Sequence, residues 1–219
     1  MVPHTVFEDT SAIEKGIDAV PETNGIFLAW YPLNDRNITK YNIYRKSSDD
    51  PFAYFRPIKT IDIESATAGK DTTFIDGNTE TGLPTYMYHY YFVTAVNKDG
   101  LEGQAGDTLR YMLLPKPELN RPDGEIYDIS VDGLPVLQWS FIDENPNLYI
   151  LQIENSWGIL HYKGVFRRDF NNDAQTLDLS TVVDLPELTP GDYRWRIDSI
   201  GPEDDDSGSE SVPKVFTIK

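Results

Sequence analysis

The chain has 219 residues, of which 39% are hydrophobic and 12% aromatic, which is enough apolar material for one or two packed cores. Its formal charge of −17 repels phosphate backbones and anionic headgroups, so neither nucleic acid nor an acidic membrane surface is expected as a partner. No apolar run approaches the roughly 20 residues of a membrane span, so membrane insertion is not expected either. The absence of cysteine excludes disulfides, thiolate nucleophiles and iron–sulfur sites.

Alternating apolar residues predict β-strands through the first half of the chain. The alternating positions are Ile26, Leu28 and Trp30, then Tyr41 and Ile43, then Tyr91, Val93 and Ala95. Residues at every second position of a strand point to the same side of the sheet, so these side chains are expected to share one core. The polar stretches 34–37 (NDRN) and 97–100 (NKDG) have the composition of turns.

The same pattern restarts after Pro115. Its alternating positions are Leu137 and Trp139, then Tyr149, Leu151 and Ile153, then Tyr193, Trp195 and Ile197. Prolines 115, 117 and 122 favour an extended chain, so the join between the halves is expected to be short and stiff. The sequence thus predicts an all-β protein with two domains, residues 1–114 and residues 115–219.

These motifs resemble strands of fibronectin type III domains, especially the bacterial ones. In the first half the resemblance rests on Trp30 with Pro32, on the run from Ile38 to Arg45, and on VTAVNKDGLEG from Val93 to Gly103. It implies two immunoglobulin-like β-sandwiches in tandem, from a cell-surface or secreted bacterial protein.

The second half resembles the family more loosely, through Leu137 with Trp139 and through LTPGDYRWRI from Leu188 to Ile197. Tyr193 matches a corner tyrosine whose hydroxyl bonds back to nearby backbone. His89 stands at that position in the first half, a departure from the family pattern.

Residues that would carry catalysis or bind a cofactor are not found. The three histidines, His4, His89 and His161, form no His-x-x-x-His pair, and the chain has neither a glycine-rich phosphate loop nor a Gly-x-Ser-x-Gly elbow. Most carboxylates stand in turns rather than as a facing pair. We therefore expect no enzyme, no cofactor and no metal.

One acidic run is the nearest approach to a metal site. Asp204, Asp205 and Asp206 lie within residues 203–210, which are expected to form an extended, solvated loop. Their spacing is not that of an EF-hand, and a run of like charge is usually solvated. Calcium is expected to bind there weakly or not at all.

The outward positions of the first domain offer a candidate binding patch. In a sandwich of this kind the third and sixth strands lie side by side, and the residues between their core positions face outward. The aromatic residues at these positions are Tyr44, Tyr88, Tyr90 and Phe92. An outer aromatic stripe is typical of an interaction site, although aromatic residues also favour strands and lysine side chains cover such rings.

The corresponding face of the second domain serves as an internal control. Its outward positions are Ile150, Gln152, Glu154, Arg194, Arg196 and Asp198, which predict a solvated face with cross-strand charge pairs. Trp157 shares the parity of Leu151 and Ile153, so it is expected to cap the core.

Three functions remain open from the sequence. The leading one, implied by the resemblance, is a non-catalytic binding or spacer module that mediates protein–protein contacts at a bacterial cell surface. The alternatives are a carbohydrate-binding accessory module, with Tyr44, Tyr90 and Phe92 as a stacking platform, and a structural subunit that self-associates through the stripe. The expected location is extracellular or at the cell surface, with the periplasm as an alternative and a secretion signal removed from the sequence.

Overall fold

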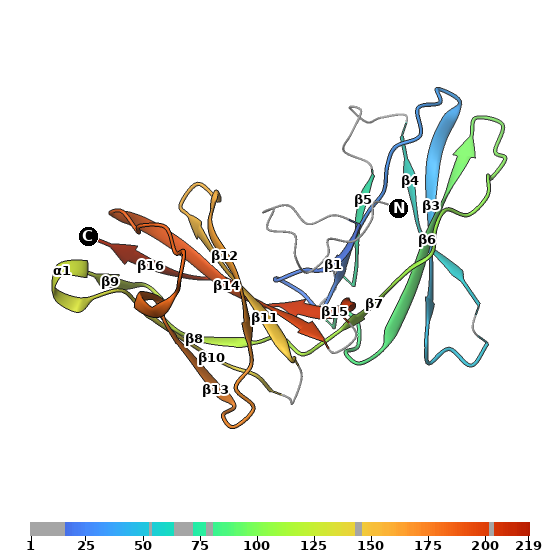
Figure 1. Ribbon diagram of the computed structural model, residues 1–219. Helices are drawn as coiled ribbons and strands as arrows, with labels where there is room; N and C mark the ends of the chain where they lie inside the picture. The colour runs from blue at the N-terminus through green and yellow to red at the C-terminus, as the bar shows by residue number, and fades with distance from the viewer. Residues whose placement is uncertain (1–15, 53, 64–71, 78–80, 143–145, 202–203) are drawn as a thin grey trace. The chain divides into compact units, whose positions relative to one another are not determined.

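The computed structural model describes residues 16–52, 54–63, 72–77, 81–142, 146–201 and 204–219, with residues 204–206 described by their backbone alone. The chain divides into two compact units between Leu113 and Leu114, one residue from the expected boundary. Both units are built from β-strands (Figure 1). The helical content of the described residues is a single turn, α1 (Ile129–Asp132), and a 3₁₀ turn, Leu179–Thr181.

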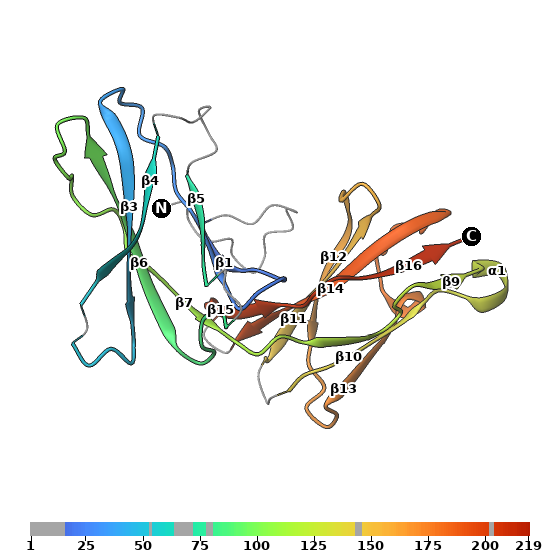
Figure 2. The same cartoon turned by 180° about the vertical axis from the view of Figure 1, so that it is seen from behind.

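The described part of the first unit contains seven strands. They are β1 (Ile17–Ala19), β2 (Ile26–Ala29), β3 (Ile38–Ser47), β4 (Arg56–Asp62), β5 (Thr73–Asp76), β6 (Tyr88–Asn97) and β7 (Leu109–Leu113). One sheet has the order β1-β2-β5, and the other has the order β4-β3-β6-β7, with antiparallel pairing throughout. The two sheets form the facing layers of a sandwich (Figures 1 and 2).

The core of the first unit lies between these sheets. The residues that the alternation predicted to point inward are buried, apart from Ala95, which is partly buried. They include Leu28 of β2 and Trp30 just after it, and Tyr41 and Tyr91 of the second sheet. Trp30 and Tyr41 meet edge to face, with ring centres 5.6 Å apart, a geometry that aromatic pairs prefer. The prediction that these residues are core is confirmed.

The second unit repeats the arrangement. Its strands are β8 (Glu118–Arg121), β9 (Glu125–Tyr127), β10 (Val136–Ser140), β11 (Leu148–Asn155), β12 (Leu160–Arg167), β13 (Ala174–Asp178), β14 (Gly191–Gly201), β15 (Asp204–Glu210) and β16 (Lys214–Ile218). One sheet is β8-β10-β13; in the other β12, β11 and β14 are neighbours, and the long β14 pairs with β16 along its first half and with β15 along its second. The short β9 runs parallel to β16.

The core of the second unit is centred on two tryptophans. Trp139 and Trp195 are both fully buried, with ring centres 6.4 Å apart. Tyr193 donates a hydrogen bond from its hydroxyl to the carbonyl oxygen of Thr189, four residues back, at 3.0 Å. This is the corner tyrosine expected from the family resemblance.

The two units thus share one arrangement of strands. The sheet β1-β2-β5 of the first unit corresponds to β8-β10-β13 of the second. The strands β4, β3 and β6 correspond to β12, β11 and β14, and β7 corresponds to the strands β15 and β16 that pair with β14. This strand order is that of an immunoglobulin-like sandwich, apart from the fourth strand, which pairs beside the third. The expected fold, all-β with two immunoglobulin-like sandwiches in tandem, is confirmed.

The acidic run after β14 is not the extended loop that the sequence predicted. Residues 204–210 form β15, in which Ser209 pairs with Ser199 and Glu210 with Asp198. Glu210 forms an ion pair with Arg196 at 2.8 Å, within the same sheet. The side chains of Asp204, Asp205 and Asp206, to which the calcium expectation applied, lie outside the described residues.

Candidate functional site

The four predicted patch residues lie together on the outer face of the β4-β3-β6-β7 sheet. The register places Tyr44 opposite Phe92 and Lys46 opposite Tyr90, while Tyr88 and Tyr90 are two residues apart on β6. All four rings are half-buried, whereas the intervening Tyr91 is fully buried. The predicted parity is therefore correct. We call this surface, made of Tyr44, Tyr88, Tyr90 and Phe92, the aromatic face.

Contacts among the rings hold the aromatic face in a fixed arrangement. Tyr44 and Phe92 stack with their centres 4.8 Å apart and their planes 19° apart. Phe55, from the segment before β4, packs against Phe92 with centres 4.7 Å apart. Tyr88 and Tyr90 lie 6.4 Å apart. Such ring pairs add stability beyond the area that they bury.

Two cations cover part of the aromatic face. The Lys46 ammonium lies 4.8 Å from the ring centre of Tyr90, and the Arg110 guanidinium lies 4.9 Å from that of Tyr88. A cation over a ring face is attracted by the electrons of the ring. The covering of rings by lysine, which the sequence left as an alternative, therefore applies to Tyr90, and the face is a mixed aromatic and cationic surface.

The expectation for the corresponding face of the second unit is wrong in one respect. Ile150, Gln152 and Asp198 are buried, with exposed fractions of 7%, 1% and 6%, rather than solvated. Gln152 donates to a carboxylate oxygen of Asp198, and Arg196 pairs with both Asp198 and Glu210. These contacts offset part of the cost of burying the groups. The expected cross-strand charge pair is present between Arg194 and Glu154.

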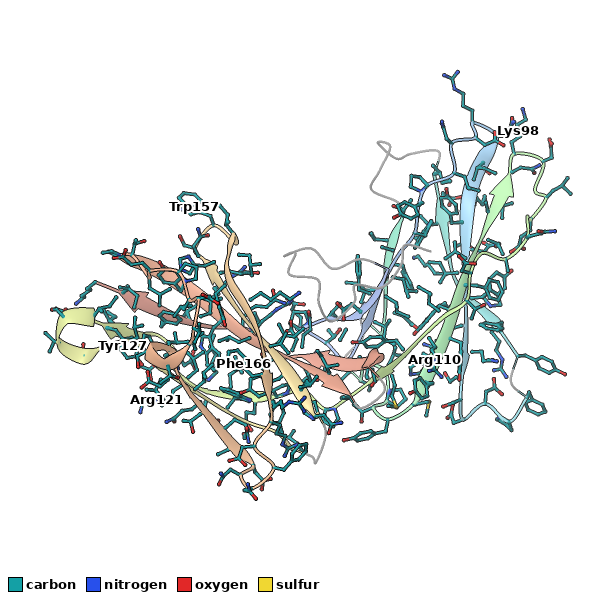
Figure 3. All side chains as sticks on the ribbon, viewed as in Figure 1. Lys98, Arg110, Arg121, Tyr127, Trp157 and Phe166 are labelled. Carbon is teal, nitrogen blue, oxygen red and sulfur yellow. The ribbon has the colours of Figure 1, made fainter. Side chains whose placement is uncertain are left out.

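Trp157 does not cap the core as predicted. It is 84% exposed and lies at the tip of the β11–β12 hairpin, where Figure 3 shows its ring outside the sheet. The amide oxygen of Asn155 accepts hydrogen bonds from the backbone N–H groups of Trp157 and Ile159, each at 3.0 Å. Since β11 ends at Asn155, the strand parity does not extend to Trp157.

A groove at one end of the first unit was not found from the sequence. It lies between the loop 31–37, which joins β2 to β3, and the segment 98–107, which follows β6, and its volume is about 890 Å³. Buried Trp30 and Tyr41 line it together with exposed Tyr31, Leu33 and Leu101. We call this cavity the loop groove.

The rim of the loop groove is acidic. Among the described lining residues four carry carboxylates, Asp35, Asp99, Glu102 and Asp107, and one carries an ammonium, Lys98. Figure 3 shows Lys98 at the end of the unit. The turns NDRN and NKDG were recognised in the sequence, but the two loops are some 60 residues apart, so their meeting required the fold.

Hydrogen bonds fix both loops. The Tyr41 hydroxyl accepts from the N–H of Leu33 at 2.8 Å, and the N–H of Lys98 donates to the carbonyl of Asn37 at 2.8 Å, which ties one loop to the other. In the second loop the Asn97 side chain accepts from the N–H groups of Asp99 and Leu101, and Gly100 adopts a φ of +79°, which favours glycine. The groove is therefore preformed.

Glu102 connects the loop groove to the aromatic face. Its Oε1 accepts hydrogen bonds from the hydroxyls of Tyr44 and Thr94, and these bonds hold the pKa of Glu102 below its usual value. The carboxylate is therefore charged at neutral pH.

Among the described residues, no group of three or more His, Asp or Glu side chains is placed to hold a metal ion. No helix in the described part of the chain is long and apolar enough to cross a membrane.

Comparisons with known proteins find distant likenesses. No protein-family model and no curated protein matches the sequence. The crystal structure of CopC from Methylosinus trichosporium OB3b is 18% identical, with a TM-score of 0.34, and the match covers 47% of this chain and 93% of that one. The FN1–FN3 domains of chicken CNTN1 are 13% identical, with a TM-score of 0.28, over 93% of this chain and 65% of that one. The strand order, rather than these distant likenesses, identifies the chain as two immunoglobulin-like β-sandwiches in tandem.

Proposed function

We propose that this chain is a non-catalytic binding module of a bacterial cell-surface or secreted protein, and that its aromatic face contacts another protein. The observation that carries the proposal is the difference between two units of the same fold. The first unit presents Tyr44, Tyr88, Tyr90 and Phe92 half-buried on its outer face, where the second has buried, mutually paired polar groups such as Gln152 and Asp198. The fold alone requires no such aromatic set.

A protein partner fits this face better than a sugar does. Stacking on a sugar ring requires a flat aromatic face that is free, but Phe92 packs between Tyr44 and Phe55, and Lys46 covers one side of Tyr90. Tyrosine, phenylalanine and arginine side chains are enriched at protein–protein interfaces, and tyrosine and arginine are enriched among the residues that carry most of the binding energy. The aromatic face is therefore suited to a protein partner that brings apolar side chains.

The test compares two variants of the full chain on a panel of purified extracellular proteins from the source bacterium. Tyr90→Ala removes a central ring of the aromatic face. Arg194→Ala is the matched control, because Arg194 is an exposed outward residue on β14, the strand of the second unit equivalent to β6. We expect Tyr90→Ala to reduce binding of a panel member at least tenfold and Arg194→Ala to leave it unchanged. Equal losses in both variants would refute the aromatic face as the contact surface.

The same variants distinguish the alternatives. Saturable binding to a neutral glycan array, lost in Tyr90→Ala, would replace the protein partner by a carbohydrate. A concentration-dependent increase in mass in sedimentation experiments, abolished by Tyr90→Ala, would show that the partner is a second copy of the chain. Fractionation of the source cells, with detection of the protein outside the cytoplasm, tests the proposed location.

A further inference from the structure

The loop groove of the first unit is a second site, separate from the protein-contacting face proposed above. Its volume of about 890 Å³ lies within the range of roughly 300–1,000 Å³ typical of ligand pockets. Buried aromatic rings line it, and its exposed walls are apolar: Tyr31 is 65% exposed and Leu101 is 67% exposed. The exposed side chains Tyr31, Leu33 and Leu101 do not belong to the core of the unit.

We propose that the loop groove binds an extended segment of a partner protein that carries lysine or arginine side chains. The aliphatic stems of such residues pack against Tyr31, Leu33 and Leu101, and their cationic ends meet the carboxylates of the rim.

The charge of the groove selects this occupant. Four carboxylates and one ammonium line it, and the chain as a whole carries a formal charge of −17. Such a field attracts cations and repels acidic segments and phosphates. A neutral sugar has no positive charge to pair with these carboxylates, whereas a basic peptide uses both the charges and the apolar walls.

The geometry lowers the entropic cost of binding. The loops on both sides are held by hydrogen bonds from Leu33 to Tyr41 and from Lys98 to Asn37. A ligand therefore does not have to order the loops, and this is the general advantage of a preorganised site. The Glu102 side chain is likewise held in place, because the hydroxyls of Tyr44 and Thr94 both donate hydrogen bonds to its Oε1.

Trp30 supplies a means of detection, because its side chain lines the groove. The chain has four tryptophans, and Trp30 is the one in the first 114 residues. Its indole signal in a ¹H–¹⁵N spectrum is identified by its loss in Trp30→Phe.

The experiment titrates the full ¹⁵N-labelled chain with the capped peptide Gly-Ser-Arg-Leu-Arg-Ser-Gly, in which both arginines fall on one side of an extended segment. Peptides with glutamine or glutamate in place of arginine are the ligand controls, and maltohexaose is the neutral sugar. We expect the arginine peptide to shift the Trp30 indole signal saturably, and the glutamine and glutamate peptides to bind at least tenfold more weakly.

Two protein variants with equal charge change locate the site. Asp99→Asn/Asp107→Asn removes two rim carboxylates, whereas Glu118→Gln/Glu187→Gln removes two exposed carboxylates of the second unit. We expect the first variant to weaken the arginine peptide about two- to thirtyfold, the range for two exposed ion pairs, and the second to leave it unchanged.

Three results would overturn the proposal: no shift of the Trp30 signal with the arginine peptide, equal weakening in both double variants, or a Trp30 shift produced by maltohexaose but not by the peptide. None of them bears on the aromatic face, which the Tyr90→Ala experiment tests separately.

Discussion

At the scale of single residues, His89 is the departure from the family pattern that has the clearest physical consequence. It is 1% exposed, and its Nδ1 lies 2.8 Å from the Ser47 hydroxyl oxygen. Burial, with a smaller contribution from the Arg45 charge, lowers the pKa of His89 below its usual value of about 6.5. The folded state therefore favours the neutral imidazole.

This pKa shift predicts a pH dependence of stability. As pH falls below about 6.5, the unfolded chain binds a proton at His89 that the folded chain resists, so stability present above that pH is lost on acidification. We expect urea denaturation of the first unit to show a larger loss between pH 7.5 and pH 5.5 in the wild type than in His89→Gln. His161→Gln, in the second unit, is the control and should retain the wild-type dependence. An equal dependence in all three proteins would contradict the prediction.

Two tyrosine hydroxyls with different acceptors give a matched pair. The Tyr91 hydroxyl donates to the Asp76 carboxylate at 2.9 Å, and Arg45 binds the same oxygen at 2.7 Å. The Tyr193 hydroxyl donates instead to a neutral backbone carbonyl. Hydrogen bonds to charged groups contribute about 1.5–3 kcal/mol and neutral ones about 0.5–1.5. We therefore expect Tyr91→Phe to destabilise its unit more than Tyr193→Phe does, measured by chemical denaturation, and the reverse order would be inconsistent with this network.

At the scale of elements, the β11–β12 hairpin contains one residue that stabilises its turn, Asn155, and one that is exposed at its tip, Trp157. Asn155 holds the turn through two hydrogen bonds, whereas Trp157 extends into solvent. Asn155→Ala is expected to lower the stability of the second unit by about 1 kcal/mol, and Trp157→Ser to change it by no more than about 0.5 kcal/mol. Urea titration of both variants measures the difference. A larger cost for Trp157→Ser would indicate that the ring packs against the unit after all.

Strand parity predicted the inside and outside of the central strands and failed at their ends. Tyr41 and Tyr91 are buried and Tyr44 and Phe92 face outward, as the alternation requires. Parity gave the wrong position for Trp157 because β11 ends at Asn155 in a local turn. Composition gave the wrong structure for residues 204–210 because it does not show that this segment pairs with β14.

At the scale of the whole molecule, the sequence predicted the tandem arrangement but not the loop groove. The repeat of the tryptophan and tyrosine pattern is a local property that can be counted along the chain. The groove, in contrast, requires Leu33 and Leu101 to lie at the same end of a sandwich, which only the pairing of β3 with β6 establishes. The covering of Tyr90 by Lys46 depends on the same register.

The two cores are built from different residues. Trp30 belongs to the cluster of the first unit and Trp139 to that of the second, and no buried residue is shared between the two clusters. We infer that residues 1–114 and residues 115–219 fold as separate domains. Replacement of a buried tryptophan by alanine costs about 3–5 kcal/mol, a large part of the roughly 5–15 kcal/mol that stabilises a domain.

Trp30→Ala is therefore expected to unfold the first domain at a much lower temperature and largely to spare the second, and Trp139→Ala to do the opposite. Differential scanning calorimetry of the full chain measures the transitions, and hydrogen exchange at the amides of β6 and β14, the central strands of the two domains, assigns each transition to its domain. A single transition shifted equally by both substitutions would show that the chain unfolds as one cooperative body. In that case the two domains would not unfold independently on either side of residue 114. A substitution in the aromatic face or the loop groove would then alter the stability of the whole chain.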